Sequence, residues 1–196
     1  MPRRKGDIEV ICGSMFSGKT EELLRRLRLA RVAGQRTQLF KPVIDDRYSS
    51  DSVVTHDGTP SQGATNADDA SDLLAKVESG SNVVGVDEAH FFDDRLVDVC
   101  VYLAHRGKRV VAAGLDQDYR GNPFNPMPRL MAVAADVTKM HAICIVCKRR
   151  ASRTQRLING QPARIDSPLI LIGGKESYEA RCSNCHSVPG KIIRRP

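Results

Sequence analysis

The stretch "DIEVICGSMFSGKTEELLRRLRLA" occupies residues 7–30 and joins an apolar run to an amphipathic pattern through a loop that contains two glycines. Residues 7–13 have the length and composition of a buried strand, and Leu23 and Leu27 then recur at helical spacing. Between the two elements, residues 13–20 fit the pattern G-x-x-x-x-G-K-[ST], in the strand–loop–helix context that this pattern requires. The stretch therefore predicts an α/β fold whose first loop binds phosphate.

The predicted phosphate loop would act mainly through its backbone. Glycines let main-chain N–H groups face phosphate oxygens, and the helix N-terminus adds its partial positive charge. The Lys19 ammonium would reach the β- and γ-phosphates of a nucleotide, and the Thr20 hydroxyl would bind Mg²⁺. An ordinary glycine turn is the alternative, but the flanking strand and helix favour the phosphate loop. The expected nucleotide-binding residues of this loop are Gly13, Ser14, Met15, Phe16, Ser17, Gly18, Lys19 and Thr20.

Apolar runs and helical patterns continue to alternate along the first two thirds of the chain. The apolar runs at residues 36–42, 82–88 and 109–116 are expected strands, with helical patterns after the first two. Residues 48–65 are polar and turn-rich, which predicts a loop or a hairpin. The alternation predicts a P-loop fold of the RecA-like type, with a mainly parallel sheet and helices on both faces.

The alternation stops at "QDYRGNPFNPMPRL", residues 117–130, where three prolines forbid a long regular element. The chain beyond is loop-rich and basic: from Lys139 onward it carries 12 Lys and Arg against 3 Asp and Glu, a local net charge of +9. We therefore expect a nucleotide-binding α/β domain at residues 1–139 and a small subdomain at residues 140–196. The basic segment could bind phosphates, nucleic acid or an acidic partner, or it could be a solvated surface.

Two acidic residues, Asp87 and Glu88, end the third expected strand, 67 residues after Thr20. A carboxylate beside a phosphate loop completes the Mg²⁺ shell, and its neighbour can accept a proton from the group that attacks the γ-phosphate. The letters DEAH at residues 87–90 suggest a helicase, but a helicase motor closes its site between two domains, and 196 residues provide about one. The sequence predicts instead a site for ATP or a close relative.

Four of the six cysteines form two C-x-x-C pairs that are separated by 34 residues, which in a cytosolic chain indicates metal rather than disulfides. Two such turns that meet at one ion give the closed tetrahedral coordination of structural Zn²⁺. The expected ligands are Cys144, Cys147, Cys182 and Cys185. His186 could replace its neighbour as the fourth ligand, whereas Cys12 and Cys100 lie in apolar surroundings and are expected in the core.

Aromatic residues make up 5% of the chain and gather near the predicted site. Phe91 directly follows the acidic stretch, and Tyr119 and Phe124 lie in the loop after the fourth expected strand. Because the carboxyl ends of parallel strands meet at one edge of a sheet, these side chains could line one pocket and stack on a flat ring. Phe92, the neighbour of Phe91, could line the same pocket, with packing in the core as the alternative. The pattern favours a small organic acceptor, and hence a kinase, over an ATPase that uses water.

Seven motifs occur in an order and at a spacing typical of one enzyme family. They are "GSMFSGKT" (13–20), "KPVIDDRY" (41–48), "DEAHFF" (87–92), "GLDQDYRGNPF" (114–124), "CIVC" (144–147), "IGGKESYEARC" (172–182) and "CSNC" (182–185). On these motifs the chain resembles the type II thymidine kinases, which are small, cytosolic, zinc-containing deoxynucleoside kinases. The resemblance covers nearly the whole chain, and several of the motifs are rare outside that family.

The resemblance implies transfer of the γ-phosphate of ATP, bound with Mg²⁺, to the 5′-hydroxyl of thymidine. Glu88 would be the base that accepts the hydroxyl proton, and Asp87 would help to hold Mg²⁺. Asp45 and Arg47 match a family pair near the phosphates, and Arg47 could stabilise charge on the transferring group. The thymine pocket would be formed by Met15, Phe91, Leu115, Tyr119 and Phe124.

The resemblance also implies a lasso loop that covers the base and reads its polar edge through main-chain hydrogen bonds. The residues expected in this loop are Leu169, Ile170, Leu171, Ile172, Gly173 and Tyr178. Zinc would anchor both ends of the lasso. Inhibition by thymidine triphosphate (dTTP) and a homotetramer are further expectations from the family, and no nucleic-acid partner is expected. No apolar run approaches the ~20 residues of a membrane span, so the sequence itself predicts a cytoplasmic protein without a membrane partner.

Two residues depart from the family pattern. Ser14 stands where the family usually has Pro, at a distance from the Lys and Thr roles. His90 stands where Gln is usual, and we expect it to contact the nucleotide or the sugar, with altered affinity or pH dependence as a consequence. This His also creates the helicase-like DEAH.

Two other classes of protein compete with the kinase interpretation. A nucleic-acid-binding ATPase would explain the zinc site and the basic C-terminal segment, and it predicts ATP turnover that DNA or RNA stimulates. A deoxynucleoside-binding module without catalysis would require Glu88 to be dispensable.

Overall fold

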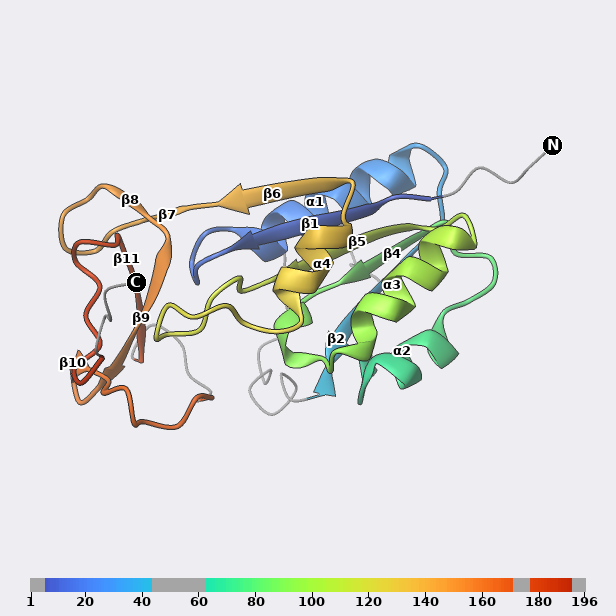
Figure 1. The fold of residues 1–196 in the computed structure, drawn as a ribbon. Coiled ribbons are helices and arrows are strands. Elements are labelled where there is room, and N and C mark those ends of the chain that lie inside the picture. Colours follow the sequence, from blue (N-terminus) through green and yellow to red (C-terminus); the bar gives the residue numbers. More distant parts are fainter. Residues whose placement is uncertain (1–5, 44–62, 171–176, 192–196) are drawn as a thin grey trace.

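Six parallel strands form the main sheet of the computed structural model, within the described residues 6–43, 63–170 and 177–191 (Figure 1). Their order across the sheet is β3-β2-β4-β5-β1-β6, and each pair of neighbours runs parallel. The strands are β1 (Ile8–Gly13), β2 (Thr37–Pro42), β3 (Thr65–Ala67), β4 (Val83–Val86), β5 (Arg109–Gly114) and β6 (Asp136–Met140). The mainly parallel α/β fold expected from the sequence is thereby confirmed.

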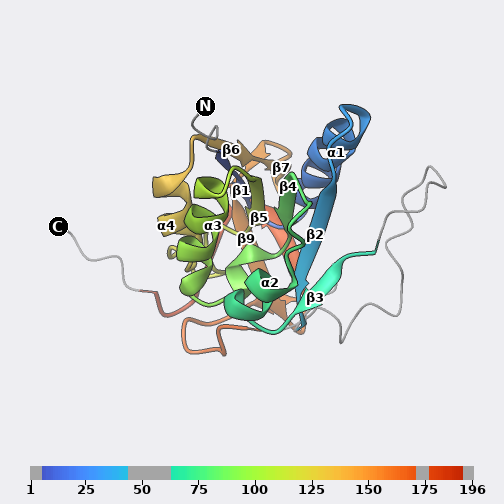
Figure 2. The same ribbon diagram turned by 90° about the vertical axis from the view of Figure 1, so that its right-hand side faces the viewer.

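Helices cover both faces of this sheet, with α1 on one side and α2, α3 and α4 on the other (Figure 2). Their bounds are α1 (Lys19–Val32), α2 (Ala70–Lys76), α3 (Arg95–His105) and α4 (Met127–Val133). Successive residues of β1 divide between the two layers, since Val10 packs on the side of the three helices and Ile11 packs on α1. Both faces are buried, which explains why the strands occur in the sequence as continuous apolar runs.

The core contains the residues that the sequence assigned to packing. Leu23 and Leu27 are fully buried on the face of α1 that packs on the sheet, as their helical spacing predicted. Cys12, Cys100 and Phe92 belong to the core cluster on the opposite face. Burial raises the pKa of the Cys100 thiol to about 12 and that of the Cys12 thiol to about 11, so both are inert packing residues.

Two elements of the main layer were not anticipated from the sequence. The proline-rich stretch contains the short helix α4, which begins after Pro126 and places Pro128 in its first turn, where a missing N–H costs little. β6 then pairs in parallel with β1 and forms one edge of the sheet. The side chains of β6 are exposed or half-buried, so it lacks the apolar run that revealed the other strands.

The C-terminal segment forms two small antiparallel sheets beyond the end of β6 (Figure 1, left). Their strands are β7 (Ala142–Ile143), β8 (Arg150–Ala151), β9 (Arg153–Ile158), β10 (Gln161–Pro162) and β11 (Tyr178–Arg181). Three alanines and one cysteine are the buried apolar residues of this core cluster, and the other three cysteines of the C-x-x-C pairs pack against it. So small a core supplies little hydrophobic stabilisation. A metal ion that crosslinks the cysteines would add stability that this core lacks.

The carboxyl ends of the central strands converge at one edge of the main sheet. β5 lies between β1 and β4, with Cys12 opposite Gly114 and Val86 opposite Ala112. The loop after β1, the acidic pair after β4 and the segment after β5 therefore begin side by side. Among the described residues, none of the helices is long and apolar enough to cross a bilayer.

Candidate active site and cysteine cluster

The loop after β1 curls around the N-terminus of α1. Gly13 has a φ of 142°, and a Cβ there would lie 2.3 Å from the Met140 carbonyl oxygen, so a side chain cannot be accommodated. Gly18, with a φ of 82°, is the N-cap of α1, and it leaves the helix without a side-chain cap. The first N–H groups of α1 are consequently available to an anion, as a phosphate loop requires.

Lys19 is buried at the base of this loop. Its ammonium donates a hydrogen bond of 2.8 Å to the carbonyl oxygen of Ser14, which also accepts one of 2.8 Å from the Ser17 hydroxyl. Burial lowers the pKa of Lys19, while Glu88 and Asp87 act to raise it. A phosphate group would give this ammonium a charged partner of high affinity.

One hydroxyl and one carboxylate lie in contact beside the loop. The Thr20 hydroxyl lies 3.0 and 3.2 Å from the two Asp87 carboxylate oxygens, although 67 residues separate them. Burial raises the pKa of Asp87, and the charge of Lys41, the last but one residue of β2, opposes that effect. Hydroxyl and carboxylate oxygens in contact are the donors that Mg²⁺ prefers, so these two residues fit the ion.

Glu88 has an unusual backbone conformation at the end of β4. Its φ of 49° and ψ of 40° are left-handed, and it is the N-cap of the 3₁₀ helix η2 (Ala89–Phe91). A non-glycine residue in this region costs about 1–3 kcal/mol and is often found at functional sites. The side chain of Glu88 is 30% exposed, whereas its neighbour Asp87 is buried.

Three rings gather beside the acidic pair. The centroid of the His90 ring lies 4.2 Å from that of Phe91 and 5.0 Å from that of Phe124, and the two Phe rings meet edge to face at 6.4 Å. Leu115, the first residue after β5, donates its backbone N–H to His90 Nδ1 at 3.1 Å. The structure thus brings together three of the residues expected at the site, Phe91, Leu115 and Phe124, around His90.

The buried imidazole of His90 makes the stability of the protein sensitive to acid. Burial lowers the pKa of His90 to about 3 from an ordinary value of 6.5. Below about pH 6.5 the His90 imidazole binds a proton in the unfolded chain but not in the folded chain. The free energy of unfolding therefore falls as the pH falls. Between pH 7 and pH 5 we expect wild type to lose about 2 kcal/mol more unfolding free energy than His90→Gln, measured by urea unfolding. Equal losses of unfolding free energy in wild type and His90→Gln would contradict the lowered pKa of His90.

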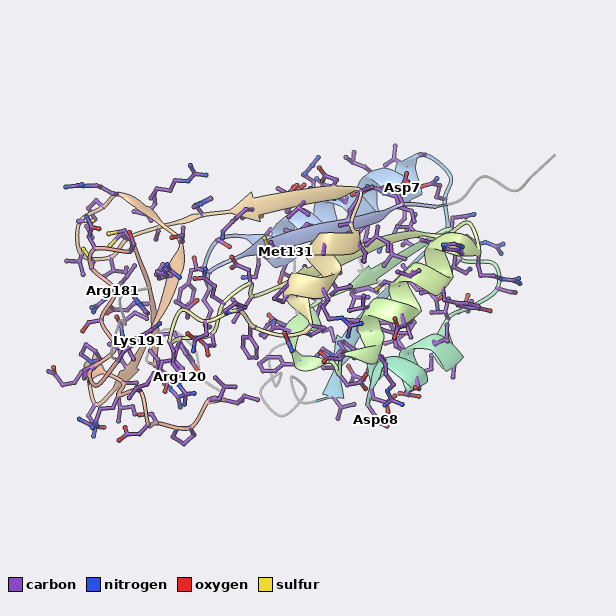
Figure 3. All side chains as sticks on the ribbon, viewed as in Figure 1. Asp7, Asp68, Arg120, Met131, Arg181 and Lys191 are labelled. Carbon is purple, nitrogen blue, oxygen red and sulfur yellow. The ribbon has the colours of Figure 1, made fainter. Side chains whose placement is uncertain are left out.

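Tyr119 contacts the segment that precedes the expected lasso. Its hydroxyl lies 2.9 Å from the carbonyl oxygens of Arg164 and Ser167, and its ring packs against the guanidinium of Arg156 at 5.0 Å. Arg120 also donates to the Ser167 carbonyl oxygen at 2.7 Å. Figure 3 shows Arg120 close to Lys191 at the end of the molecule that carries the small sheets. Tyr119 therefore joins the loop after β5 of the main sheet to the C-terminal segment.

The described lasso residues divide into exposed and buried ones. Leu169 and Ile170 are 41% and 45% exposed, whereas Tyr178 is buried in β11 opposite Arg156 of β9. The other expected site residues Asp45, Arg47, Leu171, Ile172 and Gly173 lie outside the described residues. Their roles stay predictions.

Some residues near the phosphate loop carried no signal in the sequence. The backbone N–H of Met15 donates to the Thr154 hydroxyl on β9 at 3.0 Å, across 139 residues of chain. The buried Asp116 forms an ion pair of 2.6 Å with Lys139 on β6. These contacts depend on where β6 and β9 lie, which local patterns do not reveal. Phe16, in contrast, is 45% exposed at the tip of the loop.

The four cysteines of the C-x-x-C pairs lie together in the C-terminal segment. Their Sγ atoms are all within 4.8 Å of one another, and those of Cys147 and Cys182 are 3.6 Å apart. Tetrahedral Zn²⁺ with Zn–S bonds of about 2.3 Å requires sulfur separations of about 3.8 Å, so the cluster fits this ion. Within the cluster the thiol pKa values diverge: although burial opposes it, N–H groups of Cys147 and Cys182 lower the pKa of Cys144 to about 6, whereas hydrogen bonds with Cys182 and Cys147 raise the pKa of Cys185 to about 12.

His186 does not join this cluster. Its Nε2 lies 2.9 Å from the carbonyl oxygen of Tyr119, so the ring is directed at the loop after β5. The group of possible metal ligands in the described residues contains Cys185 and not His186. Of the two candidates for the fourth ligand, the structure therefore favours Cys185.

Comparisons with known proteins bear on the whole chain. The family model described as "TK: Thymidine kinase" matches residues 6–186. Among solved structures, domain III of the replication initiation protein DnaA from Thermotoga maritima is similar, with 15% sequence identity and a TM-score of 0.40. That match covers 71% of this chain but 56% of the DnaA chain, a little over half, and the superposition is too loose to indicate function.

Proposed function

The chain belongs to the thymidine kinase family, and from this premise we propose that it transfers the γ-phosphate of ATP to the 5′-hydroxyl of thymidine, giving dTMP. The observation that carries the proposal is the meeting of three groups at one sheet edge. The uncapped N-terminus of α1 supplies a phosphate site, Thr20 and Asp87 supply oxygen ligands, and Glu88 supplies a half-buried carboxylate. An alcohol-phosphorylating enzyme needs these three groups next to one another.

The proposed mechanism assigns one task to each group. The loop and Lys19 hold the triphosphate, and Thr20 and Asp87 would hold Mg²⁺, which when bound neutralises phosphate charge. Glu88 takes the proton of the 5′-hydroxyl as the oxygen bonds to the γ-phosphorus and the bond to the β-phosphate oxygen breaks, releasing ADP. Asp45 and Arg47 are proposed to act near the phosphates, on the resemblance alone.

The proposed nucleoside site lies beside Glu88. Phe91 and Phe124 provide ring faces that thymine could stack on, and Leu115 and Met15 are half-buried at the ends of β5 and β1. Tyr119 would support the lasso from below through its bonds to residues 164–167. We propose that the lasso, residues 169–173 with Tyr178, covers the base and reads its polar edge through the main chain.

The remaining family properties are proposals of the same kind. A structural Zn²⁺ would hold residues 140–196 as a subdomain that carries the lasso, distinct from the nucleotide-binding domain at 1–139. dTTP would inhibit, because its base fits the thymine pocket and its triphosphate occupies the phosphate region. We further propose a cytoplasmic homotetramer.

Incubation with γ-labelled ATP and single nucleosides tests the proposed function. Labelled monophosphate should form with thymidine, in the absence of any polymer and in amounts that need Mg²⁺. Deoxyadenosine and deoxycytidine serve as controls for base selection. If thymidine gives no labelled product and DNA or RNA stimulates ATP hydrolysis, the kinase proposal is wrong. The protein would then be a nucleic-acid-dependent ATPase.

A further inference from the structure

His90 occupies a pocket that is built around its ring. The side chain is 1% exposed and lies between the rings of Phe91 and Phe124 and the end of β5. A Cβ at Gly114 would lie 3.2 Å from His90 Nδ1 and 2.7 Å from the Met127 sulfur, so the absence of a side chain there makes room for the ring. The imidazole therefore has one orientation in this site.

The hydrogen bond to Nδ1 determines which ring nitrogen carries the proton. The Leu115 N–H donates to Nδ1, so Nδ1 is an acceptor and the neutral ring carries its hydrogen on Nε2. Burial holds the pKa of His90 at about 3, which keeps the ring neutral at physiological pH. Nε2 is fully buried and has no hydrogen-bond partner in the described part of the chain. Such a donor is costly to leave unsatisfied.

The carboxylate of Glu88 lies close to this buried N–H. Nε2 lies 3.5 Å from Oε2 of Glu88, at the outer limit of a hydrogen bond. Catalytic hydrogen bonds are often long before substrate binds and shorten in the reactive complex. Because the His90 ring is fixed from three sides, the Glu88 side chain is the partner that would move to close the gap.

We propose that His90 is a positioning residue, whose Nε2–H donates to Oε2 of Glu88 and turns Oε1 toward the hydroxyl that is to be phosphorylated. This inference rests on the proposed function. His90 keeps its proton throughout: the hydroxyl proton passes to Glu88, and the imidazole neither gains nor loses one. The contact of His90 with the nucleotide or sugar that the sequence suggested stays a prediction, whereas the positioning role uses the ring where it lies.

Glutamine offers a matched replacement for both hydrogen bonds. Its amide oxygen can accept from the Leu115 N–H, and its amide nitrogen can donate to Glu88. Methionine has a similar length and volume but no donor. His90→Gln and His90→Met therefore differ in the proposed interaction while both fill the pocket.

Steady-state kinetics of the full chain with thymidine and MgATP distinguish these variants. His90→Met should lower kcat by about 10–100-fold with the KM of each substrate within about threefold, because a misplaced base slows the chemical step and not binding. His90→Gln should keep kcat within about threefold of wild type. Retention of kcat by His90→Met, or an equal loss in both variants, would overturn the proposal.

A spectroscopic measurement tests the same contact without activity. In ¹⁵N-histidine-labelled protein, the His90 signals, assigned by their absence in His90→Gln, should report the tautomer with hydrogen on Nε2. The Nε2–H resonance should shift in Glu88→Gln, while the Nδ1 resonance changes little. If the chemical shift of the Nε2–H resonance is unchanged in Glu88→Gln, the inference is wrong. This result can be obtained even if His90→Met fails to fold. If wild type does not phosphorylate thymidine, the proposed function is wrong. The spectrum still tests the contact between His90 and Glu88 in that case.

Discussion

Glu88→Gln is expected to lower kcat for phosphate transfer to thymidine by about 10²–10⁴-fold while ATP binding stays within about threefold of wild type. The substitution keeps the shape of the side chain but removes the lone pair that accepts the hydroxyl proton. ATP binding should persist, because the groups proposed to hold the triphosphate, the loop after β1 with Lys19 and Thr20, belong to elements other than η2. Single-turnover transfer and titration with a fluorescent ATP analogue measure the two quantities.

Asp94→Asn is a matched control for this result. Asp94 is another carboxylate close in sequence; it is the exposed N-cap residue of α3, and its side chain makes no capping hydrogen bond. Its neutralisation removes the same charge without touching the proposed base, so kcat should change less than about twofold. Full activity in Glu88→Gln would mean that another group takes the proton. Loss of ATP binding together with transfer would show a structural role for Glu88.

Cys182→Ser is expected to release zinc and to raise the KM for thymidine by about tenfold or more. Structural zinc contributes about 10–16 kcal/mol in isolated small domains, far more than this small alanine-lined core can supply. Cys182 directly follows β11, and the Ile145 N–H donates to the Ala180 carbonyl oxygen at 3.0 Å, so loss of the ion would loosen the strand that ends the lasso segment. Elemental analysis of the purified protein gives the zinc content, and steady-state assays give the KM.

Cys100→Ala provides the corresponding control. This cysteine is buried in the main core and lies outside the four-cysteine group, so its loss should leave zinc content and the KM for thymidine unchanged. Zinc retained in Cys182→Ser, with unchanged kinetics, would show that the cluster does not need this thiolate. His186→Ala should also retain zinc, because the His186 ring forms a hydrogen bond with the carbonyl oxygen of Tyr119 and lies outside the cysteine cluster.

The separate parts of the site were visible in the sequence because each depends on local chemistry. The glycines of the phosphate loop are required where Gly13 approaches Met140 and where Gly18 adopts a left-handed conformation. The strands around the site are buried on both faces, and this burial produces the apolar runs that precede residues 13 and 87. The C-x-x-C spacing likewise fixes each half of the cysteine cluster.

Other features of the fold left no local signal. β6 is an edge strand with exposed side chains, and it pairs with β1 only because that edge of the sheet is open to it. The hydrogen bond from Met15 to Thr154 joins the first strand-end loop to β9, and Tyr119 joins the loop after β5 to residues 164–167. Contacts of this kind follow from how whole layers pack and not from neighbouring residues.

The sequence by itself determined the α/β class, the phosphate loop, the acidic pair and the four cysteines, because periodicity and short motifs are set by residues close along the chain. Only the tertiary structure decided that Cys185 and not His186 joins the cluster, and that His90 is buried with its Nε2 facing Glu88. A histidine side chain can be ligand, base or packing residue. Its role depends on which backbone groups and carboxylates surround it, and distant parts of the chain supply them.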